Sequence, residues 1–507
     1  MDTKLLWKAH IDEMERKVTK TIAALSSLGS SAWGIPMREL RAIYRGVAIP
    51  QMMYACSAWS NANWFTNGEP ISTKVLTKLQ SLQARGARVI SGAYRATSVP
   101  ALNIETHLLP VEEQILKHNI DTLARIGPAE RQPFESTNSR RKRKSPRQAI
   151  EQTIRDLEGP NIRRQEQASP YVTPPWWCGP KHYIESTAEA AKQKHLKQLS
   201  DHTAIHIYTD GSGVNGHVGA AAVCTTTQDN RAVYMGTERI STVYAAELQG
   251  ILLALQIARE DKQRGNTRSR VCIYTDNQAA IRSSAKPKGK PGAYLLKAIA
   301  QITEELQQGG LPVEIRWIPA HTGIWGNEQA DKAAKEATGW REGGATGPRA
   351  AEPAELWALQ STLKTWTHKH VHKAWQDKWA NESRGRVCFR YTPKPTNKVL
   401  QLHTKLNKRQ SALLIGLRTE KIATKHFLFK QRVPGVTDDR CPCGQGRQTV
   451  LHILLRCRQH RQLRDRELGD ILGLSDLRKV LGERKAAAKA IRFMEQTGTL
   501  GHFGVEA

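Results

Sequence analysis

The sequence predicts an α/β protein whose centre is a mixed five-stranded sheet with flanking helices, preceded and followed by mainly α-helical regions. Two observations carry this prediction. Apolar residues recur at helical spacing through residues 1–127 and again through residues 352–507. Between these regions lie strand-like runs in which apolar and polar residues alternate, and the later runs are separated by amphipathic helices. Three successive strands followed by alternating helices and strands are typical of a mixed sheet with helices packed on it.

The first region and the segment after it differ in composition. The run KAHIDEMERKVTKTIAALSSL has helical periodicity, and residues 37–60 and 72–93 repeat the pattern. Residues 128–200 contain RRKRKSPR at 140–147, then TPPWWCGP, and show little periodicity, which predicts a basic linker. The basic tract fits a solvated charge run and a nuclear-import signal equally well.

Residues 201–342 are predicted to form the central domain. Its five strands are expected in the runs AIHIYTD, VGAAAVCTT, RAVYMGTE, RVCIYTD and VEIRWIPA. Helices are expected in YAAELQGILLALQIARE, NQAAIRSS, AYLLKAIAQITEELQ and NEQADKAAKEA. The first of these helices carries an apolar stripe that the sheet would bury.

The composition favours a nucleic-acid partner. The chain has 76 basic against 47 acidic residues among 507, a net charge of +29, and residues 352–507 alone hold 30 basic against 14 acidic. Such a surplus suits a polyanion, most commonly a phosphate backbone. No apolar run approaches the ~18–20 residues of a membrane span, and the N-terminus lacks a signal-peptide core. We therefore expect an intracellular protein, nuclear or cytoplasmic, with no membrane partner.

The motif Ile-Tyr-Thr-Asp occurs twice, ending at Asp210 and Asp276, although the flanking sequences differ. Each copy is a strand-like run that stops at the aspartate, so two strands are expected to deliver carboxylates to one edge of the sheet. Glu247 and Asp331 lie at the margins of the apolar faces of their helices. Four converging acids would repel unless cations neutralise them, and oxygen ligands suit Mg²⁺ or Mn²⁺. His321, in the loop PAHTGIWGN, could move protons beside two such ions.

Each of these residues also has an ordinary structural explanation. An Asp before Gly is commonly a turn former, which would account for Asp210. Asp331 could be a first-turn acid favoured by the helix dipole, and Glu247 a surface acid. A single loop histidine is usually incidental. The metal-site interpretation rests on the agreement of order, spacing and element type.

Four motifs give this region a family resemblance: DGSG at 210, AEL at 246, TDNQAA at 275 and AHTGIWGNEQADKAA at 320. Together they resemble ribonuclease H type 1 in the form found in retroelements, over roughly residues 203–340. The resemblance implies hydrolysis of the RNA strand of RNA–DNA hybrids, leaving 3′-hydroxyl and 5′-phosphate ends. It also implies that Asp210, Glu247, Asp276 and Asp331 hold two Mg²⁺ or Mn²⁺ ions. His321 would be the mobile histidine that assists proton transfer and product release.

The resemblance also implies where the substrate would bind. The expected substrate-binding residues are Gly211, Ser212, Gln278, Lys286 and Lys288. Together with Lys290, these lysines would partly replace the long basic handle of the cellular enzymes. Val243 and Tyr244 stand where cellular members have paired asparagines that read the RNA 2′-hydroxyl. Recognition of the RNA strand would therefore differ in detail.

Both flanks resemble parts of a retrotransposon polyprotein. MDTKLLWKAH, RAIYRGVAIPQMMYACSAW and SGAYRATSVPALNIETHLLP resemble the segment after the palm in fungal non-LTR reverse transcriptases. The chain begins where the palm should already have ended. Its adjacent acids Asp438 and Asp439 lie in a turn sequence beside cysteines, rather than in the aromatic-x-Asp-Asp motif of a polymerase. We therefore expect a truncated product without polymerase activity.

The C-terminal region contains a possible zinc site. Cys441, Cys443, His452 and Cys457 offer four soft ligands within 441–457, with His460 as a substitute. A tight Cys-Pro-Cys-Gly turn followed by a ligand-bearing helix could enclose one tetrahedral Zn²⁺. The spacing resembles the cysteine-histidine motif of the same polyproteins, and the surrounding arginines would help to hold nucleic acid. The alternative is a helix with two buried cysteines and an incidental histidine.

Two rival functions remain open on the sequence. One is a catalytically silent nucleic-acid-binding relic of a retroelement. The other is a polymerase subunit whose residues 1–127 bind a separate palm fragment.

Overall fold

The computed structural model describes residues 7–60, 72–126, 146–160, 165–166, 171–289, 291–471 and 476–500. The chain divides into two compact units. The first comprises Met1–Asn119, Arg143–Ala149 and His368–Ala507, and the second Ile120–Lys142 and Ile150–Thr367. The division falls within α8 (Val111–Ile126), α9 (Pro146–Asp156) and α15 (Gln360–Asn381).

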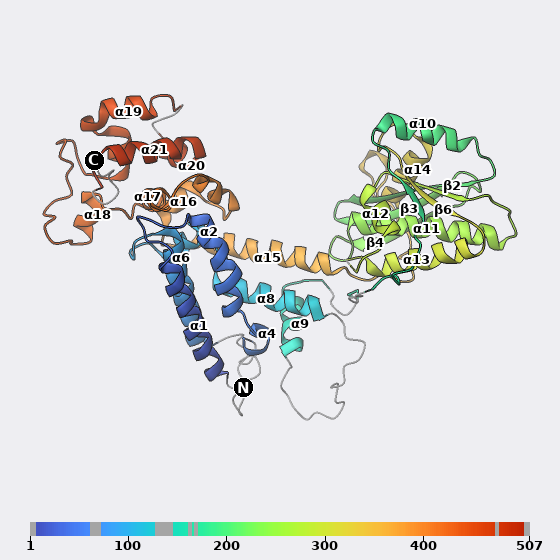
Figure 1. The fold of residues 1–507 in the computed structure, drawn as a ribbon, viewed down its shortest axis with the longest axis horizontal. Coiled ribbons are helices and arrows are strands. Elements are labelled where there is room, and N and C mark those ends of the chain that lie inside the picture. The colour runs from blue at the N-terminus through green and yellow to red at the C-terminus, as the bar shows by residue number, and fades with distance from the viewer. Residues whose placement is uncertain are drawn as a thin grey trace. The chain divides into compact units, whose positions relative to one another are not determined.

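The second unit is built on a mixed sheet (Figure 1). Its strands are β1 (Lys181–Tyr183), β2 (Ile205–Val214), β3 (His217–Cys224), β4 (Asn230–Thr237), β5 (Val271–Thr275) and β6 (Val313–Trp317). They lie in the order β1-β6-β5-β2-β3-β4. The first four in that order pair in parallel, whereas β3 pairs antiparallel with both β2 and β4. The predicted mixed α/β fold is confirmed.

The described residues form one strand more than the five predicted. The additional strand is β1, which extends the parallel edge of the sheet by pairing with β6, Lys181 opposite Glu314. Its three residues, Lys-His-Tyr, are too few and too polar to show an alternating pattern. The same segment, predicted as a linker, also contains α9 and α10 (Ala188–Leu199).

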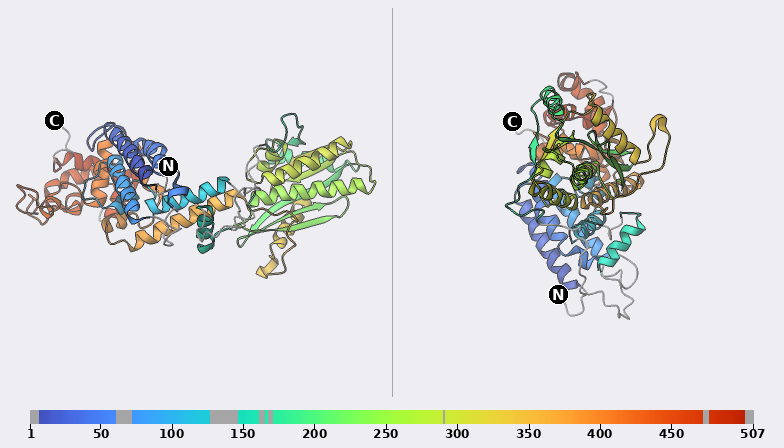
Figure 2. Two further views of the ribbon diagram at one scale, coloured as in Figure 1. Left: turned by 90° about the horizontal axis from the view of Figure 1, so that it is seen from below. Right: turned by 90° about the vertical axis from the view of Figure 1, so that its right-hand side faces the viewer.

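Helices cover both faces of this sheet. On one face lie α11 (Val243–Gln263), α12 (Gln278–Ala285) and α13 (Ala293–Gln308). Figure 2 shows the two long helices α11 and α13 side by side along the sheet. The stripe predicted on α11 is buried here against Ile205 and Ile207. The other face is covered by α14 (Trp325–Ala337), with Tyr208, Tyr274 and Ala330 in its core.

Two glycines allow the helices to approach the strands that carry the predicted acids. A Cβ on Gly250 of α11 would lie 3.0 Å from the carbonyl oxygen of Ala221. A Cβ on Gly326 of α14 would lie 2.3 Å from the ring of Tyr208. Helices on both faces are thus held close to β2, and their polar residues reach its edge.

The first unit is helical in all its described elements, which confirms the predicted helical flanks. Its N-terminal part contains α1 (Lys8–Ser26), α2 (Met37–Ile43), the π-helical turn η1 (Tyr44–Ala48), α3 (Ile49–Met52), α4 (Cys56–Trp59), α6 (Thr73–Ser91) and α7 (Val99–Glu105). Its C-terminal part contains α16 (Arg386–Tyr391), η4 (Asn397–His403), α17 (Lys408–Thr419), α18 (Lys425–Lys430), η5 (His452–Arg456), η6 (Arg458–His460), α19 (Arg461–Leu468), α20 (Leu477–Gly482) and α21 (Arg484–Gln496).

A buried ion pair joins these two parts of the first unit. Arg418 of α17 donates from Nε to both carboxylate oxygens of Glu105, at 2.9 and 3.0 Å. Its two other nitrogens donate to the carbonyl oxygen of Leu481 and the hydroxyl of Thr392. Both partners are almost fully buried. The N-terminal and C-terminal helical regions therefore share one core, although they are far apart in sequence.

Two expectations about location concern membrane-spanning helices and the basic tract at residues 140–147. No helix in the described part of the chain is both long enough and apolar enough to cross a bilayer. Residues 140–145 of the basic tract, like Lys290, lie outside the described residues.

Candidate functional site

The two Ile-Tyr-Thr-Asp motifs lie side by side in the sheet. β2 and β5 pair in parallel with Thr209 opposite Thr275, so Asp210 and Asp276 are the next residues of two aligned strands. We expected both strands to end at the aspartate, and for β2 this is wrong. β2 continues to Val214 because β3 provides an antiparallel partner past Asp210, whereas β5 ends at Thr275. The aspartates meet where the parallel ladder stops.

Glu247 completes a compact group of three acids. Oxygen atoms of Asp210, Glu247 and Asp276 all lie within 4.8 Å of one another. Glu247 comes from α11, which begins at Val243 after Thr242 caps its end by accepting from the backbone N–H of Ala245. A Cβ on Gly211 would lie 2.4 Å from the backbone nitrogen of Glu247, so glycine is needed for this approach.

Burial and mutual repulsion raise the pKa values of these acids and so favour their protonated forms. Asp210 is 6 % exposed and Glu247 4 % exposed. Burial, followed by the charges of Asp276 and Asp331, raises the pKa of Asp210 to about 7. Burial, followed by the charges of Asp210 and Asp276, raises the pKa of Glu247 to about 9. Burial also raises the pKa of Asp276. Because the charged forms of these acids are unfavourable, a cation bound beside them would stabilise the site.

Asp331 lies near this group but outside its closest contacts. It stands on α14, and its charge contributes to the raised pKa values of Asp210 and Asp276. One of its oxygens accepts from the Lys335 ammonium one helical turn later, at 2.7 Å. Lys335 therefore occupies the position of a counter-ion for the fourth predicted acid.

His321 lies at the margin of the site. It is exposed, in the loop between β6 and α14, and has a positive φ of 49°. Its charge, when it is protonated, lowers the pKa of Asp276 and opposes the dominant effect of burial there. The role expected for His321 in proton transfer stays a prediction.

Three polar residues that the sequence analysis did not single out support the acids. Asn277 caps α12 by accepting from two backbone N–H groups, and its amide hydrogen-bonds Glu247. Thr275 donates to Glu247 at 3.4 Å. Asn327 is buried, hydrogen-bonds Asp276 through its side chain, and its Oδ1 has no partner among the described residues. Asn277 and Asn327 lie within motifs quoted above, but only contacts across the fold show their role.

The predicted substrate-binding residues differ in accessibility. Gly211 and Ser212 are buried on β2, whereas Gln278 begins α12 and is half-buried. The side-chain oxygen of Gln278 accepts from Arg282 at 3.0 Å. Lys286 and Lys288 follow the end of α12 and are exposed.

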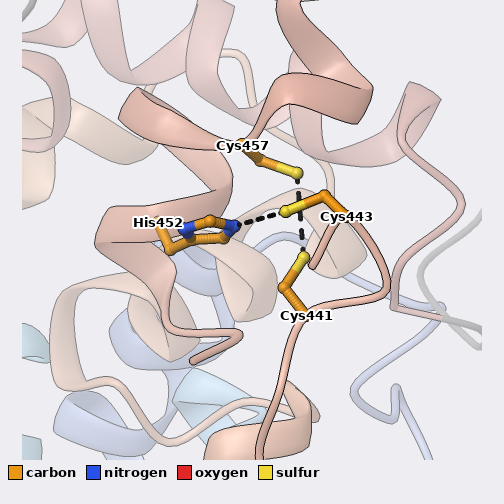
Figure 3. A group of neighbouring side chains, drawn as sticks. All are labelled: Cys441, Cys443, His452 and Cys457. Atoms are coloured by element: carbon orange, nitrogen blue, oxygen red, sulfur yellow. Dashed lines mark hydrogen bonds between the residues drawn. The ribbon is translucent and has the colours of Figure 1, made fainter. Parts of the chain in front are cut away.

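The four predicted zinc ligands converge in the first unit (Figure 3). Cys441 and Cys443 lie on a tight turn that is closed by a bridge between Arg440 and Arg447. The π-helical turn η5 begins at His452, and Cys457 follows its end. One ligand atom of each of the four residues lies within 4.8 Å of the others.

Distances within this cluster match a tetrahedral site. The sulfurs of Cys441 and Cys457 are 3.7 Å apart, and Sγ of Cys443 is 3.2 Å from Nε2 of His452. A disulfide would need about 2.05 Å. Tetrahedral zinc with Zn–S bonds of about 2.3 Å places its sulfurs about 3.8 Å apart. His460, the substitute ligand, instead contacts Thr499 and Phe493.

Comparisons with known proteins concern the second unit. Residues 202–339 match the family model described as RNase H, and this domain has the RNase H-like fold. RNase H1 from the archaeon Halobacterium salinarum is 19 % identical over 26 % of this chain and 96 % of its own, with a TM-score of 0.21. The N-terminal RNase H domain of a Mycobacterium tuberculosis protein is 19 % identical over 27 % and 98 %, with a TM-score of 0.22. A foamy viral protease-reverse transcriptase in complex with RNA/DNA hybrid is 18 % identical over 26 % and 20 %, with a TM-score of 0.22.

Proposed function

We propose that the domain at residues 202–339 hydrolyses the RNA strand of RNA–DNA hybrids in a metal-dependent reaction. The observation that carries the proposal is the convergence within 4.8 Å of three acids, the buried Asp210 and Glu247 and the half-buried Asp276. Among the described residues, no lysine or arginine forms an ion pair with any of these three acids. Charge repulsion between buried carboxylates destabilises the folded state unless bound cations neutralise it.

The donor set fits Mg²⁺ or Mn²⁺. It consists of carboxylate oxygens, which hard cations prefer, and contains no thiol or imidazole ligand at its centre. Asp210, Glu247 and Asp276 would hold the ions, with Asp331 as the fourth ligand once it exchanges Lys335 for metal. Two ions bound there would activate water and stabilise the leaving oxygen at phosphorus.

The chain's own residues would orient and move protons around this centre. Asn277 and Thr275 hold the Glu247 carboxylate, and Asn327 holds that of Asp276. His321 is exposed on a loop, so it can exchange a proton with solvent while remaining close to Asp276. It would therefore supply or remove the proton at the reacting phosphate.

Recognition of RNA would not use the N-terminal side chains of α11. Val243 is apolar, and the hydroxyl of Tyr244 is hydrogen-bonded to Ser283. The exposed Lys286 and Lys288 would contact phosphates, which gives affinity without sequence reading. Backbone groups of Gly211 and Ser212 next to the acids are then the candidates for contact with the cleaved strand.

The test is cleavage of a labelled RNA–DNA hybrid with Mg²⁺, with single-stranded RNA and duplex DNA as controls. The proposal predicts cutting of the hybrid alone, with products that end in 3′-hydroxyl and 5′-phosphate groups. Binding of the hybrid without cutting, weakened steeply by salt, would favour the catalytically silent relic.

We also propose that Cys441, Cys443, His452 and Cys457 hold one structural Zn²⁺. The sulfur distances support this assignment, as does the burial of Cys441 and Cys457. Zinc bound there would fix the turn to η5, and the nearby arginines would hold nucleic acid. Metal analysis of the purified chain should find about one zinc, and Cys443→Ser should lose it. Cys178→Ser is the matched control, because Cys178 is exposed in the other unit.

The origin of the chain is a further part of the proposal. The motifs of the domain, the helical flanks and the Cys₃His cluster together support descent from a non-LTR retrotransposon polyprotein. The nucleic-acid partners would then be those of reverse transcription.

A further inference from the structure

The first unit contains a cationic pocket that the proposed ribonuclease activity does not use. Its volume is about 640 Å³, within the ~300–1,000 Å³ typical of ligand sites. All of its lining residues belong to the first unit. Its cationic lining residues are Arg88, Arg95, Arg384, Arg386, Lys421 and Lys430. Among the described residues that line it, Glu420 is the single one with a carboxylate.

Carboxylates of the described residues leave most of this charge unneutralised. Arg384 forms an ion pair with Glu382 at 3.2 Å. The other five cations of the lining have no carboxylate within ion-pair distance among the described residues. Arg386 is held by backbone carbonyls, including that of Ala380 at 3.1 Å, and by stacking on the Phe389 ring. Such contacts position a guanidinium without cancelling its charge.

The wall of the pocket also holds polar atoms without protein partners. Thr97 is only 2 % exposed, yet its hydroxyl makes no hydrogen bond to any described residue. The same holds for the hydroxyl of Ser98 and for Nε of Arg88, both of which are inaccessible atoms. Leaving a buried donor unpaired is unfavourable for folding. Two unpartnered hydroxyls and one unpartnered guanidinium N–H therefore belong to residues that line a cationic recess.

We propose that this pocket binds a phosphate monoester at the end of a nucleic-acid strand. A monoester carries about −1.5 to −2 charges near pH 7 and three terminal oxygens, against one charge for a diester. A terminal group can also enter a recess, whereas an internal diester is flanked by sugars on both sides. Thr97 and Ser98 would donate to its oxygens, and Arg88 would pair with its charge.

A binding experiment on the full chain tests the assignment directly. Short single-stranded DNA oligonucleotides with a 5′-phosphate, a 3′-phosphate or only hydroxyl ends are compared by fluorescence anisotropy at near-physiological salt. DNA strands alone are not substrates of the proposed ribonuclease, so this result is independent of that activity. At least one phosphorylated strand should bind about tenfold more tightly than the hydroxyl strand. Equal affinities for all three would overturn the proposal.

Substitutions locate the preference in the pocket. Thr97→Val keeps the volume of the side chain and removes one donor, and Arg88→Gln removes one charge. Both should reduce the preference for the phosphorylated strand severalfold. The control is Arg484→Gln, which removes an equal charge from another basic surface of the same unit. It should weaken binding of all strands alike and leave the preference intact. A preference that survives both pocket variants would show that the end is bound elsewhere.

Competition distinguishes a strand end from a free nucleotide, which offers the same monoester. A mononucleotide monophosphate should displace the phosphorylated strand only at concentrations far above the strand's own dissociation constant, since it lacks the contacts of the attached strand. Equal affinities of nucleotide and strand would keep the monoester chemistry but refute its assignment to a strand end.

Discussion

Replacing Asp210 by Asn should stabilise the metal-free domain, and the gain should depend on pH. Asp210 is buried beside two other acids, and burial with the charges of Asp276 and Asp331 raises its pKa from 3.8 to about 7. Asn keeps the shape of the side chain and carries no charge. Asp210, which is expected to be essential for catalysis, should thus lower the free energy of unfolding of the metal-free domain.

The magnitude follows from the pKa. A rise from 3.8 to about 7 corresponds to about 4 kcal/mol at 1.36 kcal/mol per pH unit, which is an upper bound for the ionised side chain. Because the folded pKa is raised, protonated Asp210 contributes stability below about pH 4, and this contribution is lost as the pH rises to about 7. The advantage of Asn should therefore grow by about 2–3 kcal/mol between about pH 5 and pH 8. Saturating Mg²⁺ should reverse it, since the wild type alone keeps the full ligand set.

Local hydrogen exchange is the suitable assay, because the chain has two compact units and a single melting temperature would mix them. Protection of amides in β2, β3 and α11 is compared between wild type and Asp210→Asn in chelator at each pH. Asp201→Asn is the matched control. Asp201 has a lowered pKa, owing to hydrogen bonding by Thr203, and so its loss should destabilise at neutral pH. A pH-independent difference for Asp210→Asn would refute the account of repulsion at the site.

Three further predictions concern the rest of the molecule. Glu105→Gln should destabilise the first unit by about 3–5 kcal/mol by leaving Arg418 unpaired, whereas the double variant with Arg418→Met should recover much of this loss in denaturant unfolding. Burial lowers the pKa of Lys408 from 10.5 to about 8, so the charged amine opposes folding below that pH. Hydrogen-exchange protection of α17 should therefore rise between about pH 8 and 10.5 in the wild type. Lys408→Met should show no such rise. Gly211→Ala should cost about 1–3 kcal/mol and reduce hybrid cleavage, because its Cβ would meet the backbone of Glu247. Gly482→Ala is its comparison, because a Cβ there would lie in open space and the backbone does not have positive φ.

The sequence predicted the parts of the site that follow from local pattern. The repeated Ile-Tyr-Thr-Asp motif indicated that Asp210 and Asp276 meet, and in the structure each comes directly after the last residue pair of the parallel ladder between β2 and β5. The spacing of cysteines and His452 similarly indicated a compact cluster. In the first case the two acids belong to strands that the sequence pattern indicates, and in the second all four residues lie within 17 positions of one another.

Features that depend on partners distant in sequence were not predictable. The extension of β2 past Asp210 depends on β3, and the edge strand β1 depends on β6. The pairing of Glu105 with Arg418 joins regions 313 residues apart, and no local periodicity reports it. Asn327 could be seen in the sequence as part of a motif, but its contact with Asp276 exists only after α14 packs on the sheet.

Single-turnover cleavage of a labelled RNA–DNA hybrid in Mg²⁺, with binding measured in parallel, tests the central claim most directly. The wild type, Asp210→Asn and the surface control Asp201→Asn are compared. The account predicts that Asp210→Asn binds the hybrid but does not cut it, while Asp201→Asn and the wild type cut the RNA strand at similar rates. Cleavage that survives in Asp210→Asn, or a wild type that binds without cutting, would contradict it.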